Sequence, residues 1–459
     1  MTLALGKGKG LEQRHLTMMS IAGVIGAGLF VGSGRVVASA GPAAILAYAM
    51  GGTLVVLVMR MLGEMAVASP DTGSFSTYAD RAIGPWAGFT IGWLYWWFMV
   101  LVLPLEANVA GLIIHSYLPV IPVWFSALAM TVLLTVTNLF SVRNYGEFEF
   151  WFGLIKVVTI VCFIALGGLA ITGFLPGSQV SGIHSLTQPN GFMPNGFSAV
   201  LSAMLGTMFV FVGAEIVTIA ASESSNPKVQ VTRSIKSVVW RICLFYIGSI
   251  FVIVALVPSN DPLLAHEGAY QRTLELLNIP YAKQLMDFVV LTSVASCFNS
   301  SLYTSSRMLF SLSSRSDGPR FTRILSKDGT PRRAVCMSSA VGSLAVVANY
   351  IVPEKVFVVL MDTTGAIGLM VYLIIAVAQL RSRTGAKYKG ESLELKMWLF
   401  PWLTLGVIAF ILAVLVLMIV SPEHRGEVGS TAVLAGITVC FGVFRQRRRV
   451  ATHRDTAVT

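Results

Sequence analysis

The chain has 459 residues, of which 55% are hydrophobic and only 12% are charged. A water-soluble globular protein of this size needs more charged side chains to cover its surface. The composition therefore excludes a soluble globular protein and predicts a chain that lies in a lipid bilayer.

Crossing the hydrocarbon core of a bilayer takes about 20 apolar residues in a helix. Runs of that length, bounded by charges or turn-forming residues, predict an all-α membrane protein with twelve spanning helices. A β-barrel is not predicted, because the runs do not alternate between apolar and polar residues. The predicted spans are 17–38, 42–66, 87–114, 122–140, 150–173, 197–221, 237–257, 284–311, 334–352, 356–379, 398–420 and 428–444.

The net charge of +11 follows a topological pattern rather than a nucleic-acid site. Basic residues gather at 315–333, 381–389 and 445–449, which all face the cytoplasm if the N-terminus is cytoplasmic. This positive-inside bias predicts a multi-pass protein of the cell inner (plasma) membrane with both termini cytoplasmic.

No soluble domain is predicted, because the hydrophilic stretches between the spans are short. We expect function to lie among the helices, with the bilayer as the surroundings and no required protein partner. The predicted segments are a cytoplasmic N-tail (1–16), a ten-helix core (17–379), a cytoplasmic loop (380–397), two accessory helices (398–444) and a basic cytoplasmic C-tail (445–459).

The first span is rich in glycine, notably at Gly26-Ala27-Gly28. Glycine allows the chain to leave helical geometry and to expose backbone N–H groups, which bind a carboxylate without a charged side chain. Close packing of helices through Gly28 and Gly32 is the alternative interpretation. Because glycines are so dense here, we favour a break in the helix.

A similar interruption is predicted in the sixth span, before Gly213-Ala214-Glu215. The two interrupted spans are five spans apart. This spacing suggests a 5+5 inverted repeat in which the first helix of each half is broken at the bilayer midplane.

Charged side chains within hydrocarbon are costly, so each needs a cavity, a partner or a function. The predicted spans contain four such residues, namely Glu106, Lys156, Glu215 and Asp362. Lys156 could extend to the interface, or its ammonium could occupy the place of a coupling ion. Glu215 beside the sixth-span break can bind and release a proton, whereas a structural role is the alternative for all three carboxyl groups.

Two further clusters are candidates for a transport path. Tyr95 lies among tryptophans of the third span and could face inward while they face lipid. The eighth span carries a dense series of hydroxyl and amide side chains, which favours a polar path through the bundle. The series consists of Ser293, Ser296, Asn299, Ser300, Ser301, Thr304 and Ser305.

Motifs for catalysis are missing from the sequence. No phosphate-binding loop, zinc-protease helix or nucleophile elbow is present, and no two histidines have the spacing of metal ligands. We therefore expect no enzyme activity, no metal and no cofactor.

The first-span stretch SIAGVIGAGLFVGSG (20–34) is the signature of a known family. The chain resembles the bacterial amino acid transporter family of the amino acid–polyamine–organocation (APC) superfamily from about residue 11 to 445. Within that family, four stretches are most similar to γ-aminobutyrate (GABA) permeases. They are PDTGSFSTYAD (70–80), GWLYWW (92–97), NYGEFEFW (144–151) and GAEIVTIA (213–220).

The resemblance implies a permease of the LeuT fold that imports an amino acid, with γ-aminobutyrate as the leading candidate, as a symporter with H⁺. It implies that the unwound backbone at Gly26, with the amides of Ala27 and Gly28, holds the substrate carboxylate. The carbonyl oxygens of Val24, Phe209 and Val212 would meet the substrate amine, and the Phe209 ring would close over it. Tyr95 would be a gating residue, while Lys156, Glu215 and Glu106 would couple transport to protons.

Alternatives remain open at this stage. GABA permeases carry a serine where Gly28 stands, so selectivity could extend to proline, aromatic or cationic amino acids. A channel or a membrane nutrient sensor is the rival from another class.

Overall fold

The computed structural model describes residues 13–458, except 23–24, 141, 188–190, 212, 223–225, 265–267, 352, 386–394 and 422–424. Within these residues the chain is helical and contains no strand. The elements are α1 (Gln13–Ala22), α2 (Ala27–Phe30), α3 (Gly32–Ala40), η1 (Gly41–Ala43), α4 (Ala44–Ala68), α5 (Ser74–Ala82), α6 (Pro85–Tyr117), α7 (Val123–Leu139), α8 (Val142–Ile171), η2 (His184–Thr187), α9 (Gly196–Phe211), α10 (Ile216–Ser222), α11 (Pro227–Arg241), η3 (Ile242–Gly248), α12 (Ser249–Leu256), α14 (Ala269–Leu276), α15 (Ala282–Ser314), η4 (Arg320–Arg323), α16 (Arg332–Ile351), α17 (Pro353–Thr384), α18 (Trp402–Val420) and α19 (Arg425–Val458).

The helices are those of a membrane protein. Eight described stretches are long and apolar enough to cross a bilayer, and α7 and α9 add two shorter apolar helices. One of the eight, Ala27–Ala68, joins the second part of the first predicted span to the whole of the second. The prediction of an all-helical membrane protein is therefore confirmed.

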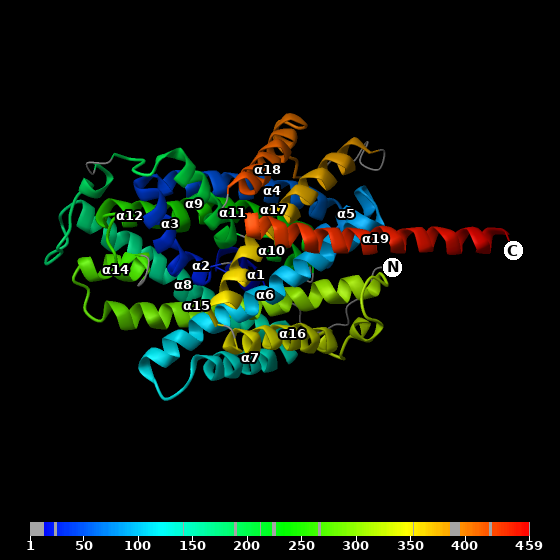
Figure 1. Cartoon of the computed structure of the whole chain (residues 1–459), viewed down its shortest axis with the longest axis horizontal. Coiled ribbons are helices and arrows are strands. Elements are labelled where there is room, and N and C mark those ends of the chain that lie inside the picture. The colour runs from blue at the N-terminus through cyan, green and yellow to red at the C-terminus, as the bar shows by residue number, and fades with distance from the viewer. Residues whose placement is uncertain are drawn as a thin grey trace.

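The long helices α6 and α15 form the centre of the bundle. They pack along each other, and α6 also contacts α5, α7, α16, α17 and α19 (Figure 1). The most apolar window of α6 is 67% buried inside the protein, whereas the corresponding windows of α18 and α19 are only 28% and 17% buried. The last two helices thus lie at the periphery, where apolar side chains face lipid.

The peripheral helix α18 is attached to the bundle through a buried carboxyl group. Oε2 of Glu64 on α4 accepts hydrogen bonds from the Met397 amide at 2.6 Å and from Gln379 of α17 at 3.2 Å. Thr404 of α18 donates to Gln379 at 3.1 Å. These bonds connect three helices in a region where an unpaired polar group would be costly.

Both predicted interruptions are present in the structure. In the first span α1 ends at Ala22 and α2 begins at Ala27, with the backbone extended at Gly26. In the sixth span α9 ends at Phe211 and α10 begins at Ile216. Between them Gly213 has a φ of 107°, which is strained for any residue with a Cβ.

The contact between α8 and α12 provides a direct test of this packing. A Cβ at Gly167 would overlap the Val252 side chain, whereas a Cβ at the adjacent Gly168 would have no neighbour within 4 Å. We expect Gly167→Ala to destabilise the folded protein by about 1–3 kcal/mol through overpacking. Gly168→Ala should be neutral or stabilising by up to about 1 kcal/mol, because alanine favours a helix.

Thermal unfolding of the two purified variants in detergent would measure this difference. Equal midpoints for Gly167→Ala and Gly168→Ala would contradict the close approach of α8 and α12.

Candidate functional site

The broken helices of the first and sixth spans lie against each other. α1 contacts α10, α2 contacts α9, and α15 contacts both α2 and α10. The two interruptions are therefore brought together next to the central helix α15. Non-helical backbone at membrane depth is tolerated where it is buried in protein or lines a cavity.

The first break faces a carboxyl group from the third span. The Ala27 amide donates a hydrogen bond to Oε2 of Glu106 at 3.3 Å. A Cβ added at Gly26 would lie 2.7 Å from Oε1 of Glu106 and 2.9 Å from Sγ of Cys297. The absence of a side chain at Gly26 thus allows a carboxyl group and a thiol to reach the unwound backbone.

Lys156 of α8 lies in a buried hydrogen-bonded group. Its Nζ donates to Oγ of Ser296 on α15 at 2.9 Å. Ser296 donates in turn to Oε2 of Glu149 at 2.8 Å, and the Asn299 amide donates to Oε1 of Glu149 at 3.1 Å. Lys156 is fully buried, so its ammonium does not extend to the interface.

The second break contains Glu215. Its Oε1 accepts a hydrogen bond from the Gly213 amide at 2.9 Å, so the carboxyl group satisfies one N–H that the break exposes. The hydroxyls of Tyr95 and Tyr372 lie within electrostatic range of Glu215. In the part of the chain that the structure describes, Oε2 of Glu215 and both of these hydroxyls are buried without a geometrically regular hydrogen bond.

Unpaired buried polar atoms are costly, because burial removes the water that would otherwise bond them. The Tyr95 hydroxyl and the Glu215 carboxyl group interact with each other, and the Tyr372 hydroxyl lies within electrostatic range of Glu215, so three buried oxygen-bearing groups gather beside the second break. The ring of Tyr95 is held in place by Phe75, with the ring centroids 4.7 Å apart.

The structure brings together most of the predicted site residues. Gly26, Ala27, Glu106 and Lys156 surround the first break, with Glu106 and Lys156 in electrostatic range of each other. Tyr95 and Glu215 lie at the second break, and Gly28 is half-buried on α2. Val24 and Val212 lie outside the described residues, and so do the side chains of Phe209 and Asp362.

Sequence reasoning missed Glu149. The predicted fifth span began at residue 150, which placed Glu149 in a loop, whereas α8 begins at Val142. The start of α8 contains polar residues that interrupt the apolar run, although Tyr145 and Glu149 are buried, so a search for apolar runs does not find this part of the helix. A carboxyl residue seven positions before a buried lysine was the available signal, because that spacing places both on one face of a helix.

The eighth-span series lies on α15, and all seven of its members are buried. Ser296 and Asn299 bond α8, which accounts for part of the series by contacts between helices.

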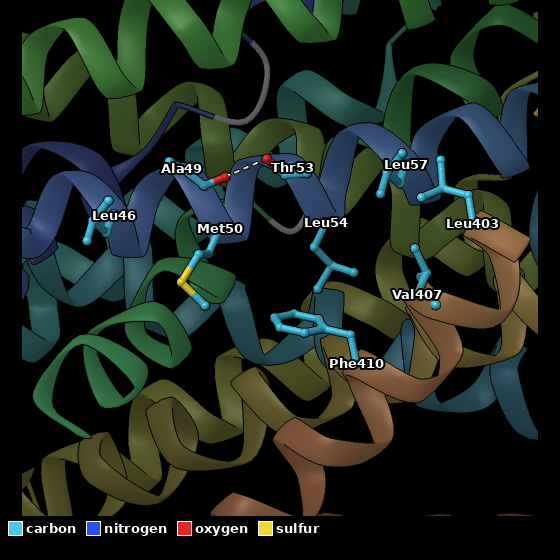
Figure 2. A pocket seen from close by; sticks show the side chains of 10 residues that line it. Leu46, Ala49, Met50, Thr53, Leu54, Leu57, Leu403, Val407 and Phe410 are labelled. Atoms are coloured by element: carbon cyan, nitrogen blue, oxygen red, sulfur yellow. Dashed lines mark hydrogen bonds between the residues drawn. The ribbon is translucent and has the colours of Figure 1, made fainter. Parts of the chain in front are cut away.

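A separate groove of about 420 Å³ lies between α4 and α18. Figure 2 shows apolar side chains of both helices, including Met50, Leu54 and Phe410, around this space. Its lining contains no charged residue. Such a groove suits a hydrocarbon chain and offers no charged group to a charged ligand.

A helical membrane bundle in which two broken spans meet beside buried carboxyl groups and a buried lysine has the arrangement of an integral membrane transporter. A family model described as amino acid permease matches residues 15–444. The chain therefore belongs to the amino acid permease family, which consists of transporters and not of enzymes.

Individual relatives agree with this assignment over nearly the whole chain. The probable GABA permease of Pseudomonas aeruginosa is 61% identical over 98% of this chain and 94% of its own length. The γ-aminobutyric acid permease of Escherichia coli is 59% identical over 98% of this chain and 97% of its own length. The corresponding permease of Bacillus subtilis is 50% identical over 96% and 95%.

Among solved structures, the manganese transporter of Eremococcus coleocola has the same fold. The TM-score is 0.58 over 95% of this chain and 94% of the other, at 12% sequence identity. At that identity the likeness concerns the fold alone. Within the residues described here, no three His, Cys, Asp or Glu side chains are grouped as they would be around a metal ion.

The close contact at Gly26 leads to a prediction about the site. Gly26→Ala should strongly reduce amino acid uptake, because the added methyl group would displace Glu106 and Cys297 from the break. Gly32→Ala is the matched control, since a Cβ at Gly32 meets nothing within 4 Å. Uptake of labelled amino acid by cells with equal amounts of each variant in the membrane would measure the effect. Equal loss in both variants would argue against a specific role of the contact.

Proposed function

We propose that this protein imports γ-aminobutyrate together with H⁺ across the inner membrane by alternating access. The names of its relatives at 50–61% identity support the substrate. The observation that carries the proposal is the hydrogen bond between the Ala27 amide and Glu106 at the break of the first span. This contact links the binding of a carboxylate to the protonation of a carboxyl group.

The link follows from competition for one donor. An N–H group at a helix break is a good partner for a carboxylate, and the Glu106 carboxyl already accepts its hydrogen bond. A proton on Glu106 removes its charge, and a neutral carboxyl group accepts a weaker hydrogen bond than an ionised one. The amide is then available to the carboxylate of the substrate. Proton and substrate consequently favour each other's binding, which is the requirement for symport.

The opposite end of the substrate would lie at the second break. Oε2 of Glu215 and the hydroxyls of Tyr95 and Tyr372 offer buried oxygen atoms to an ammonium group. Carbonyl oxygens of Val24, Phe209 and Val212 would complete the amine site, as the family resemblance implies. A γ-amino acid separates its two charges by a flexible methylene chain, which allows it to reach both breaks.

We further propose a LeuT-type architecture of twelve spans with both termini in the cytoplasm. Residues 17–379 would form a 5+5 inverted repeat that carries the transport, with residues 1–16 as its N-tail. The loop 380–397 would lead to two accessory helices at 398–444 and a basic tail at 445–459. The hydrogen bonds around Glu64 support an attachment of the first accessory helix to this core.

Reconstitution provides the direct test of function. In proteoliposomes with an inward pH gradient, the purified protein should concentrate labelled γ-aminobutyrate, and an uncoupler should abolish the accumulation. Vesicles without protein are the control. Absence of accumulation, or accumulation indifferent to the uncoupler, would contradict proton-coupled import.

The coupling residues lead to a second test. Lys156→Ala should abolish concentrative uptake, because an uncompensated carboxyl cluster would remain in the membrane. Glu106→Gln imitates the protonated carboxyl group, so substrate binding should lose its dependence on pH.

Lys283→Ala is the control, since Lys283 is exposed at the start of α15. Binding and gradient-driven uptake can be measured in parallel on the same preparations. Undiminished accumulation by Lys156→Ala would reject its coupling role.

A broader selectivity is the second candidate, and Gly28 is the observation that favours it. The family resemblance implies a serine at that position in GABA permeases, whereas the glycine of this chain leaves more space beside the proposed carboxylate site. An aromatic amino acid transport protein of Corynebacterium glutamicum is 39% identical to this chain. Competition by a panel of amino acids distinguishes a γ-aminobutyrate permease from one of wider range.

A further inference from the structure

Glu149 is a buried carboxyl group to which the proposed function assigns no role. Glu149 is only 1% exposed. It lies on α8, seven positions before Lys156. Seven residues are two helical turns, so both side chains project from the same face of α8, about 10 Å apart along its axis. A carboxyl group at such a depth is costly and requires partners or a function.

The connection between Glu149 and Lys156 runs through a hydroxyl group. Ser296 accepts from Nζ of Lys156 at 2.9 Å and donates to Oε2 of Glu149 at 2.8 Å. A hydroxyl group can accept and donate at the same time. The three side chains therefore form a continuous hydrogen-bonded path along which a proton can pass.

The charges of the group favour the uptake of one proton. Lys156 is within electrostatic range of both Glu106 and Glu149. One ammonium group cannot neutralise two carboxylates, so one of the two has to be protonated for the three groups to be neutral together. In low dielectric a neutral group is favoured over a charged one.

Polar side chains continue the path beyond Glu149. The Tyr145 hydroxyl, one turn earlier on α8, is 3.2 Å from the Ser300 hydroxyl. The ring of Tyr145 stacks on that of Tyr303 with centroids 4.2 Å apart, and the Arg307 guanidinium lies 3.7 Å above Tyr303. Positions 296, 300, 303 and 307 follow one face of α15 toward its C-terminal end at Ser314. That end faces the cytoplasm in the proposed topology.

We propose that Glu149 carries the coupling proton between Lys156 and the cytoplasmic side of the protein. In this step the Lys156 ammonium gives a proton to the Ser296 hydroxyl, which gives its own proton to the Glu149 carboxylate. The lysine and the glutamate both become neutral and the serine is unchanged. One proton has moved, and the net charge of the three groups is the same before and after the step. The assignment rests on the proposed proton symport and topology.

Other titratable groups influence the protonation of Glu149. Lys156 and Tyr145 on its own helix and Cys297 on α15 lie within electrostatic range of it. Tyr303 and Arg307 of α15 act on Tyr145, and Glu106 of α6 acts on Lys156.

The decisive experiment compares two transport modes of Glu149→Gln in proteoliposomes. Gradient-driven accumulation of γ-aminobutyrate should be lost, because an amide cannot take up the proton. Counterflow, in which labelled substrate outside exchanges with unlabelled substrate inside at equal pH, should persist because it needs no net proton movement. Accumulation at the wild-type level by Glu149→Gln would overturn the proposal.

Matched variants separate the proton path from simple packing. Ser296→Ala should reduce accumulation relative to counterflow, because it removes the connecting hydroxyl. Thr273→Val, which removes a buried hydroxyl that donates to the Ala269 carbonyl of its own helix, should change neither. Equal effects of Ser296→Ala and Thr273→Val on the ratio of accumulation to counterflow would overturn the path.

The carboxyl group itself is tested by Glu149→Asp, which also serves if Glu149→Gln does not fold. The aspartate should retain accumulation with an altered pH dependence of the uptake rate. An unaltered rate and pH profile would overturn the proposal. Failure of the wild-type protein to accumulate substrate would instead contradict the proposed function, which keeps the two conclusions distinguishable.

Discussion

The structure depends on how interrupted backbone is satisfied inside a membrane. Hydrocarbon offers no water to an exposed N–H group, so a break in a spanning helix needs partners from the protein. Carboxyl groups supply partners at both breaks, Glu106 for the Ala27 amide and Glu215 for the Gly213 amide. Each carboxyl group thereby occupies a place that an anionic ligand could take. The fold needs a hydrogen-bond acceptor at each exposed amide, and a ligand carboxylate could replace the protein carboxyl group in that place.

Replacement of a protein carboxylate by a ligand carboxylate at a backbone amide would affect the charge of the displaced group. A carboxylate displaced from an amide in low dielectric must find another donor or become protonated. Lys156 lies within reach of the same group of residues and is itself bonded to Ser296. In the proposed symport, substrate, proton and lysine would therefore be coupled through a small set of donors and acceptors. No large displacement of charge is needed for one of them to influence the others.

Much of this site could be predicted from the sequence, and the omissions have identifiable causes. Gly26 and Gly213 indicated the two helix breaks. The free-energy cost of placing charge in hydrocarbon pointed to Glu106, Lys156 and Glu215 as functional candidates. Glu149 was missed because a hydropathy boundary reports composition, whereas its burial results from packing of α8 against α15. The bond from Ala27 to Glu106 joins residues 79 positions apart, and no local pattern encodes such a pairing.

The position of α15 explains how substrate binding at the first break could be linked to proton movement in the proposed symport. Ser296 bonds the α8 lysine, while its neighbour Cys297 contacts the first break at Gly26. Successive residues of a helix point about 100° apart, so one turn of α15 faces both the Lys156–Glu149 group and the first break. A ligand shifts a conformational equilibrium only through contacts that differ between the two states. In the proposed transport cycle, closure of the first break around a substrate would change the contacts of Cys297, and the same turn of α15 would carry that change to Ser296 and the groups bonded to it.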